Sequence, residues 1–204
     1  MAPRSVALAK IPVWALSLAP FGWLLVRGLG LGGTSLGANP VEMVLLTLGK
    51  TGLNLLLITL AVTPARRLTG WNWLIKFRRL LGLFAFFYLA LHFTTYAVLD
   101  VQLAWTTILV DLTQRPYVIA GMAALLGMIP LVLTSTQAMQ RRLGRKWLTL
   151  HKSVYAVSVL AVVHFMWQSK ADLDPEPIVY AAILTALLGY RFWHWLRHRR
   201  VRRA

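Results

Sequence analysis

The chain has 204 residues, of which 58% are hydrophobic and only 14% are charged, whereas about a quarter of the residues of a soluble domain are charged. This composition excludes an ordinary water-soluble domain and indicates a protein that is solvated by a lipid bilayer. The absence of cysteine excludes disulfides, thiolate metal sites, cysteine nucleophiles, iron–sulfur clusters and covalent CxxCH haem attachment.

Six hydrophobic segments are long enough to cross a membrane, because a spanning helix needs about 20 mostly apolar residues. Each must be helical, since unpaired backbone groups are too costly in lipid. The predicted fold is therefore all-α, a polytopic bundle in which residues 1–204 form a single transmembrane domain. The first segment is predicted to be an uncleaved span, because no convincing cleavage site follows it. The predicted spans are 11–31, 41–63, 80–99, 117–138, 148–167 and 177–195.

The connections between these spans alternate in charge. Basic residues lie at both termini and in the second and fourth connections, and Lys and Arg mark cytoplasmic loops, so both ends are predicted to be cytoplasmic. The net charge of +16 is explained by this orientation and by contact with anionic lipid head groups, so no nucleic-acid partner is expected. Every acid lies in the other three connections or at the end of a span beside them: Glu42, Asp100, Asp111, Asp172, Asp174 and Glu176.

Histidines within the spans are the candidate functional residues, because ionisable groups are costly there. From the predicted helix directions, His92 and His164 share one level in the outer half of the membrane, whereas His151 lies near the cytoplasmic surface. Two imidazoles at one level can ligate the iron of a haem between two helices. Histidines that hydrogen-bond between helices are the alternative, and spacing alone leaves both open. Zinc or copper is less expected, because no third ligand lies at that depth.

Two stretches of sequence indicate a family. Residues 77–83 read Phe-Arg-Arg-Leu-Leu-Gly-Leu and precede His92, and residues 133–141 read Leu-Thr-Ser-Thr-Gln-Ala-Met-Gln-Arg and precede His151. These motifs resemble the ferric reductase-like transmembrane proteins, and within them the MsrQ (YedZ) family, the haem-binding membrane subunits of a periplasmic methionine sulfoxide reductase system. The resemblance covers nearly the whole chain, with residues 41–170 as the haem-binding core.

The resemblance implies an electron-transfer subunit with no catalytic residues of its own, multi-pass in the bacterial inner membrane. It would carry haem b and relay electrons from the quinone pool, or from a cytoplasmic flavin reductase through FMN. The acceptor would be a periplasmic molybdopterin-containing methionine sulfoxide reductase subunit that repairs oxidised periplasmic proteins.

The same resemblance implies that His92, His151 and His164 are metal ligands. Relatives of the oxidase and ferric reductase type hold two haems with four histidines, and this chain keeps three of those positions. At the fourth it has Arg78 and Arg79, so one haem is expected and a second stays open. His151 would either ligate a second haem with an unusual partner or help bind quinone or FMN beside Arg78 or Arg79.

Two other functions remain open. A stand-alone ferric or oxygen-reducing transmembrane reductase shares the histidine pattern but usually carries a fused flavin domain, and none is expected here because the chain ends at Ala204. A non-haem membrane transporter is the alternative of a different class. It predicts charged residues at mid-membrane, where Lys50 is a candidate with no assigned role.

Overall fold

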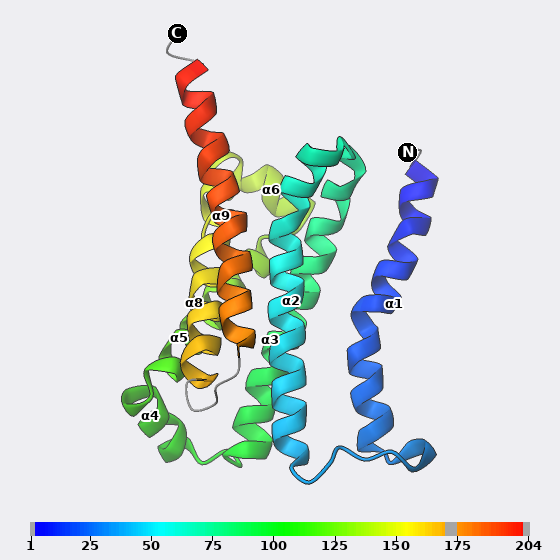
Figure 1. Cartoon of the computed structure of the whole chain (residues 1–204), viewed down its shortest axis with the longest axis vertical. Helices are drawn as coiled ribbons and strands as arrows, with labels where there is room; N and C mark the ends of the chain where they lie inside the picture. The colour runs from blue at the N-terminus through cyan, green and yellow to red at the C-terminus, as the bar shows by residue number, and fades with distance from the viewer. Residues whose placement is uncertain (1–2, 170–174, 202–204) are drawn as a thin grey trace. The chain divides into compact units, whose positions relative to one another are not determined.

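The computed structural model describes residues 3–169 and 175–201, and within these ranges the chain is helical and contains no strand (Figure 1). Asp172 and Asp174, predicted for an outer connection, lie outside the described residues. The long helices are α1 (Pro3–Gly28), α2 (Pro40–Thr69), α3 (Arg78–Thr95), α5 (Pro116–Leu133), α8 (Val154–Gln168) and α9 (Glu176–Val201). Shorter helical segments are η1 (Leu31–Gly33), η2 (Asn72–Phe77), η3 (Tyr96–Asp100), α4 (Trp105–Gln114), α6 (Gln137–Leu143) and α7 (Arg145–His151).

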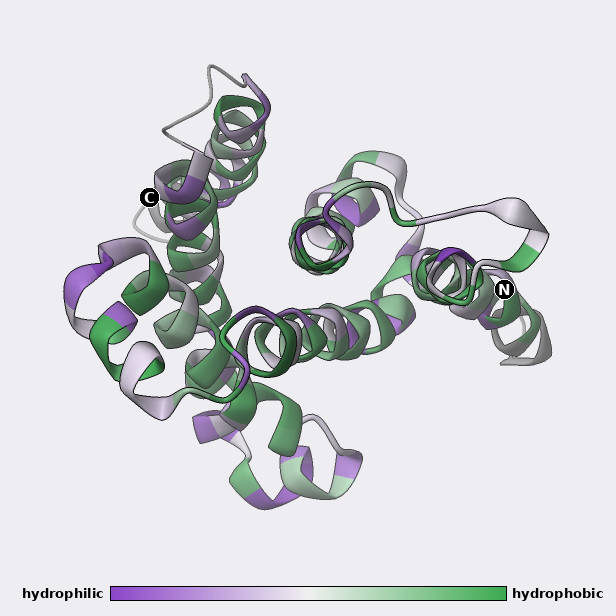
Figure 2. Ribbon diagram, turned by 90° about the horizontal axis from the view of Figure 1, so that it is seen from below, coloured by the Kyte–Doolittle hydropathy of each residue, from purple (hydrophilic) through white to green (hydrophobic). Residues whose placement is uncertain are grey.

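Five helical stretches in the described part of the chain are long and apolar enough to cross a membrane, and they correspond to the first five predicted spans. They are Leu8–Gly28, Pro40–Thr69, Asn72–Asp100, Pro116–Leu133 and Arg145–Gln168. Figure 2, a ribbon coloured by hydropathy, shows many hydrophobic residues along the long helices. The chain is thus a multi-pass membrane protein. The sixth predicted span falls on α9, which is not among the five, so its crossing and the orientation of the termini remain predictions.

The chain folds as two compact units. The first comprises Met1–Thr59 and Lys76–Arg115, and so contains α1, most of α2, α3, η3 and α4. The second comprises Leu60–Ile75 and Pro116–Ala204, and so contains the end of α2 together with α5 to α9.

In the first unit, Tyr88 on α3 fastens α3 to α1. Its side chain is fully buried, and its hydroxyl donates a hydrogen bond to the carbonyl oxygen of Ser17 at 2.6 Å. The same hydroxyl accepts a hydrogen bond from the backbone N–H of Phe21 at 3.2 Å. Ser17 and Phe21 are one helical turn apart, so the Tyr88 hydroxyl contacts the backbone of α1 across a single turn. Pro20 lies within this turn. Edge-on contacts between aromatic rings of α1 and α3 extend this interface.

Replacing Tyr88 by phenylalanine is expected to lower the free energy of unfolding by about 1–3 kcal/mol, because the buried carbonyl of Ser17 and the part-buried N–H of Phe21 lose a partner while the ring is kept. The measurement is the thermal unfolding midpoint in detergent. Thr185→Val is the control, since it removes an exposed hydroxyl that donates to a carbonyl of its own helix. An unchanged midpoint for Tyr88→Phe would contradict the fastening role.

In the second unit, α5 packs along α8, and α9 packs against α8. Small residues allow the close approach of α5 and α8, as is common between membrane helices. A Cβ on Gly127 would lie only 2.8 Å from the Val157 side chain. Ser158 is fully buried at this interface and donates its hydroxyl proton to the Val154 carbonyl oxygen at 2.7 Å.

Two predicted spans end or break earlier than expected. The fourth stops at Leu133, and residue 138 instead belongs to α6, whose N-terminus is capped by the Thr136 hydroxyl. The fifth is divided between α7 and α8, because the backbone at Lys152 and Ser153 turns through i→i−3 hydrogen bonds. The Ser153 hydroxyl also donates to the Leu150 carbonyl oxygen at 2.8 Å and supports this turn.

Candidate functional site

His92 lies on α3 in the first unit and contacts the backbone of α2. Its Nδ1 is 2.9 Å from the carbonyl oxygen of Leu45. A carbonyl oxygen can only accept, so this hydrogen bond requires the proton on Nδ1 and leaves the lone pair on Nε2. The ring lies against Gly49, where an added Cβ would be 3.0 Å from Nδ1. His92 therefore presents the tautomer that ligates a metal through Nε2.

His164 has the corresponding environment in the second unit. It lies on α8, and its Nδ1 is 2.7 Å from the carbonyl oxygen of Tyr117 on α5. The ring lies against Gly121, where an added Cβ would be 2.7 Å from Nδ1 and 2.9 Å from Cε1. The carbonyl again fixes the proton on Nδ1 and the lone pair on Nε2.

The two environments are copies of one arrangement, which we call the histidine cradle: a backbone carbonyl, a glycine one turn later, and the histidine. In both units the histidine follows the carbonyl residue by 47 positions. The cradle of residues 45, 49 and 92 recurs 72 positions later as residues 117, 121 and 164. Neither glycine and neither carbonyl was predicted from the sequence, although their shared spacing is a signal in the sequence that identifies them.

His151 is held differently. Its Nδ1 is 3.2 Å from the carbonyl oxygen of Trp147, on its own helix α7, and its ring stacks on Trp147 at 3.9 Å between centroids. The Trp147 indole N–H in turn donates to the Thr134 carbonyl oxygen at 2.9 Å. His151 thus belongs to a local cluster of the second unit and not to a cradle.

The two arginines named with His151 lie in the first unit, in the first turn of α3. Arg78 is half-buried and Arg79 is exposed. At the 72-residue spacing, Arg79 stands at the position that corresponds to His151. The repeat therefore has histidine in both copies at positions 92 and 164, whereas at positions 79 and 151 it has histidine only in the second copy.

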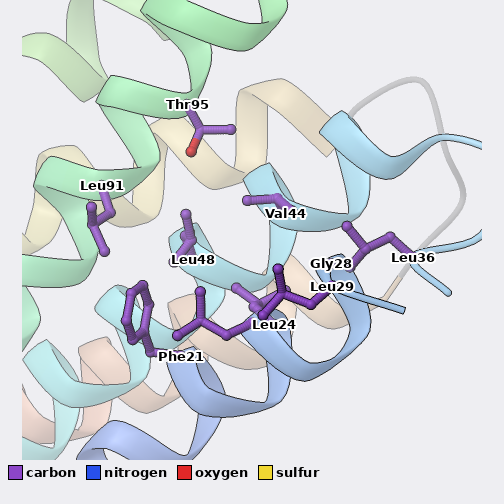
Figure 3. A pocket seen from close by; sticks show the side chains of 10 residues that line it. Phe21, Leu24, Gly28, Leu29, Leu36, Val44, Leu48, Leu91 and Thr95 are labelled. Carbon is purple, nitrogen blue, oxygen red and sulfur yellow. The ribbon is translucent and has the colours of Figure 1, made fainter. Parts of the chain in front are cut away.

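An apolar cavity of about 270 Å³ lies in the first unit (Figure 3). Leu48 and Leu91, which line it, are the neighbours in sequence of Gly49 and His92. Thr95 contributes the one hydroxyl among the lining side chains. Such a lining suits an apolar group. Across residues 3–169 and 175–201, no group of three or more His, Asp or Glu side chains could hold a metal ion.

The sequence matches the family described as ferric reductase like transmembrane component over residues 47–162, a range that includes His92 and His151 and ends just before His164. It is also similar to proteins named protein-methionine-sulfoxide reductase heme-binding subunit MsrQ. That of Xanthomonas campestris pv. campestris (strain 8004) is 47% identical over 205 residues, covering 98% of this chain and 94% of the relative. That of Ralstonia nicotianae is 47% identical over 194 residues, covering 94% of this chain and 88% of the relative.

Proposed function

Because the chain belongs to the MsrQ family of ferric reductase-like membrane proteins, we propose that it is the haem-binding membrane subunit of a methionine sulfoxide reductase system. In this role it relays electrons across the bacterial inner membrane and carries no catalytic residues of its own. The haem would be of the b type, and His92 and His164 would hold its iron.

The observation that supports this proposal is the pair of histidine cradles. Both imidazoles carry the proton on Nδ1 and the lone pair on Nε2, as an axial ligand of haem iron requires. Both lie on helices that are apolar enough to span the membrane, and both are predicted at one depth. Two imidazoles suit haem better than zinc, which takes three or four protein ligands, because the described residues contain no group of three or more His, Asp or Glu that could hold a metal ion. These residues therefore fit a haem.

The chain's own residues would orient the ligands and tune their basicity. Haem held by these two histidines would supply one-electron chemistry for the relay. A carbonyl that accepts the Nδ1–H makes the imidazole a stronger donor and holds the plane of its ring. Leu45 and Tyr117 provide these carbonyls from α2 and α5.

The electron donor is proposed to act at the cytoplasmic side, where His151 is predicted to lie. It is either a quinone or a flavin reductase that delivers electrons through FMN. His151, Arg78 and Arg79 would bind this donor or a second haem. The acceptor is a periplasmic molybdopterin-containing catalytic subunit that reduces methionine sulfoxide in oxidised proteins.

An absorption spectrum of the detergent-purified protein tests the proposal. We expect the bands of low-spin haem, and the pyridine haemochrome assay should identify haem b and count it. The reduced protein should then be reoxidised by the catalytic subunit with methionine sulfoxide present, and not by either alone. Colourless protein from haem-replete cells would overturn the proposal. A transporter would also be colourless, whereas a stand-alone reductase would be reoxidised by ferric iron or oxygen at a comparable rate.

A further inference from the structure

We propose that Gly49 and Gly121 are positioning residues, which expose the backbone carbonyls that orient His92 and His164. This inference rests on the proposed function only where it concerns haem. The part that concerns the histidine tautomer stands on the geometry of the chain alone.

A glycine in a helix leaves the backbone carbonyl of the preceding turn accessible. Side chains on a helix lean toward its N-terminus, so each covers the surface of the preceding turn. Gly49 follows Leu45 by one turn, and Gly121 follows Tyr117 by one turn. In both cradles the uncovered carbonyl is the one that the imidazole contacts, at 2.9 Å for His92 and 2.7 Å for His164.

The imidazole rings of His164 and His92 also lie directly against Gly121 and Gly49. A Cβ on Gly121 would lie 2.7, 2.9 and 3.1 Å from three atoms of the His164 ring, closer than side chains pack. On Gly49 the corresponding distances from His92 are 3.0, 3.1 and 3.7 Å. A methyl group would therefore push either ring away from its carbonyl, and His164 more than His92.

The backbone conformation at positions 49 and 121 does not require glycine. Both lie inside helices, where glycine is less favourable than alanine, and neither has a positive φ. Gly22 on α1 and Gly189 on α9 are also helical, but a Cβ there would meet nothing within 4 Å. Gly127 on α5 is closely packed, yet its neighbour is the side chain of Val157. These three glycines provide matched controls.

The experiment compares Gly121→Ala and Gly49→Ala with Gly127→Ala and Gly189→Ala in the full-length protein. Haem affinity is measured by titrating haem into the apoprotein, and the ligand geometry by the low-spin electron paramagnetic resonance signal and the reduction potential. We expect Gly121→Ala to weaken haem binding about tenfold to a hundredfold, as losing a partner of a metal-ligating histidine does. Its low-spin signal should shift, and Gly49→Ala should change both quantities less. The two controls should keep the wild-type signal and potential.

A second measurement needs no haem. Nitrogen-15 NMR of histidine-labelled apoprotein reports which ring nitrogen carries the proton, and His164 should lose its Nδ1–H form in Gly121→Ala while His92 keeps it. The proposal is overturned if Gly121→Ala retains the wild-type tautomer, signal and potential, or if Gly127→Ala shows the same shift. The failure of the proposed function looks different: the wild-type protein would bind no haem, while the tautomer would still respond to the glycine.

Discussion

Replacing His164 by alanine is expected to remove the low-spin haem signal, and replacing His92 by alanine is expected to remove the same signal. If both imidazoles ligate one iron, either change leaves it with a single strong protein ligand, which weakens binding and ends bis-histidine coordination. The measurement is the absorption and electron paramagnetic resonance spectrum of each purified variant, with haem counted by pyridine haemochrome. Haem content should fall at least tenfold, or the remaining haem should become high-spin.

Two other histidines supply the comparison. His194 lies on α9 and stacks on Tyr190 with the rings nearly parallel, so His194→Ala should leave the signal intact. His151→Ala should retain the low-spin signal and slow its reduction by quinone or flavin donors. Loss of the main signal in His151→Ala alone would show that the assignment of ligands by depth is wrong.

Replacing Arg191 by leucine is expected to destabilise the second unit by about 3 kcal/mol. The reason is that Arg191 donates to the Leu60 carbonyl oxygen, which has lost its usual helical donor because residue 64 is proline. Proline has no N–H, so the carbonyl of Leu60, four residues earlier in α2, cannot receive the usual helical hydrogen bond. Leu60 is fully buried, and the Arg191 guanidinium on α9 donates to this carbonyl. The guanidinium also lies over the Tyr155 ring at 5.4 Å. Breaking a hydrogen bond from a charged group and leaving its acceptor unsatisfied accounts for an effect of this size.

The Pro64→Ala variant tests whether the Leu60 carbonyl is the group through which Arg191 stabilises the protein. It restores an N–H at position 64, which can bond to the Leu60 carbonyl within α2, so it should recover about 1 kcal/mol or more in the Arg191→Leu background. Thermal unfolding of the two single variants and the double variant in detergent gives this coupling. Arg197→Leu is the control, because it removes an exposed arginine from the same helix. Strictly additive effects of the Arg191 and Pro64 substitutions would contradict the mechanism.

Hydropathy predicted six spans, and the first five of them correspond to helices that are long and apolar enough to cross a membrane. They could be predicted because the length of an apolar segment is a property of the local sequence. Hydropathy did not predict the turn at Lys152 and Ser153, which depends on i→i−3 hydrogen bonds inside an apolar stretch. It also missed α4 and α6, since short helices in connections have no spanning signature. The hydrogen bond from Arg191 to the Leu60 carbonyl, which compensates for Pro64, joins residues far apart in sequence, and only the packing of the helices reveals it.

The candidate site was predictable in part. The histidines could be selected from the sequence because an ionisable residue in an apolar segment is conspicuous. Gly49 and Gly121 could not be selected in the same way, because glycine is common in membrane helices for several reasons. Their role depends on which carbonyl each one uncovers, and that is fixed only when α2 meets α3 and α5 meets α8.

The use of backbone carbonyls to hold both imidazoles affects how this protein can evolve. Every amino acid carries the same carbonyl, so positions 45 and 117 can change identity without removing the acceptor, and they already differ as leucine and tyrosine. The glycine one turn later has no such latitude. We therefore expect selection to retain the two glycines and the two histidines of the cradles. The side chains at positions 45 and 117 can change to suit the lipid and the helices around them.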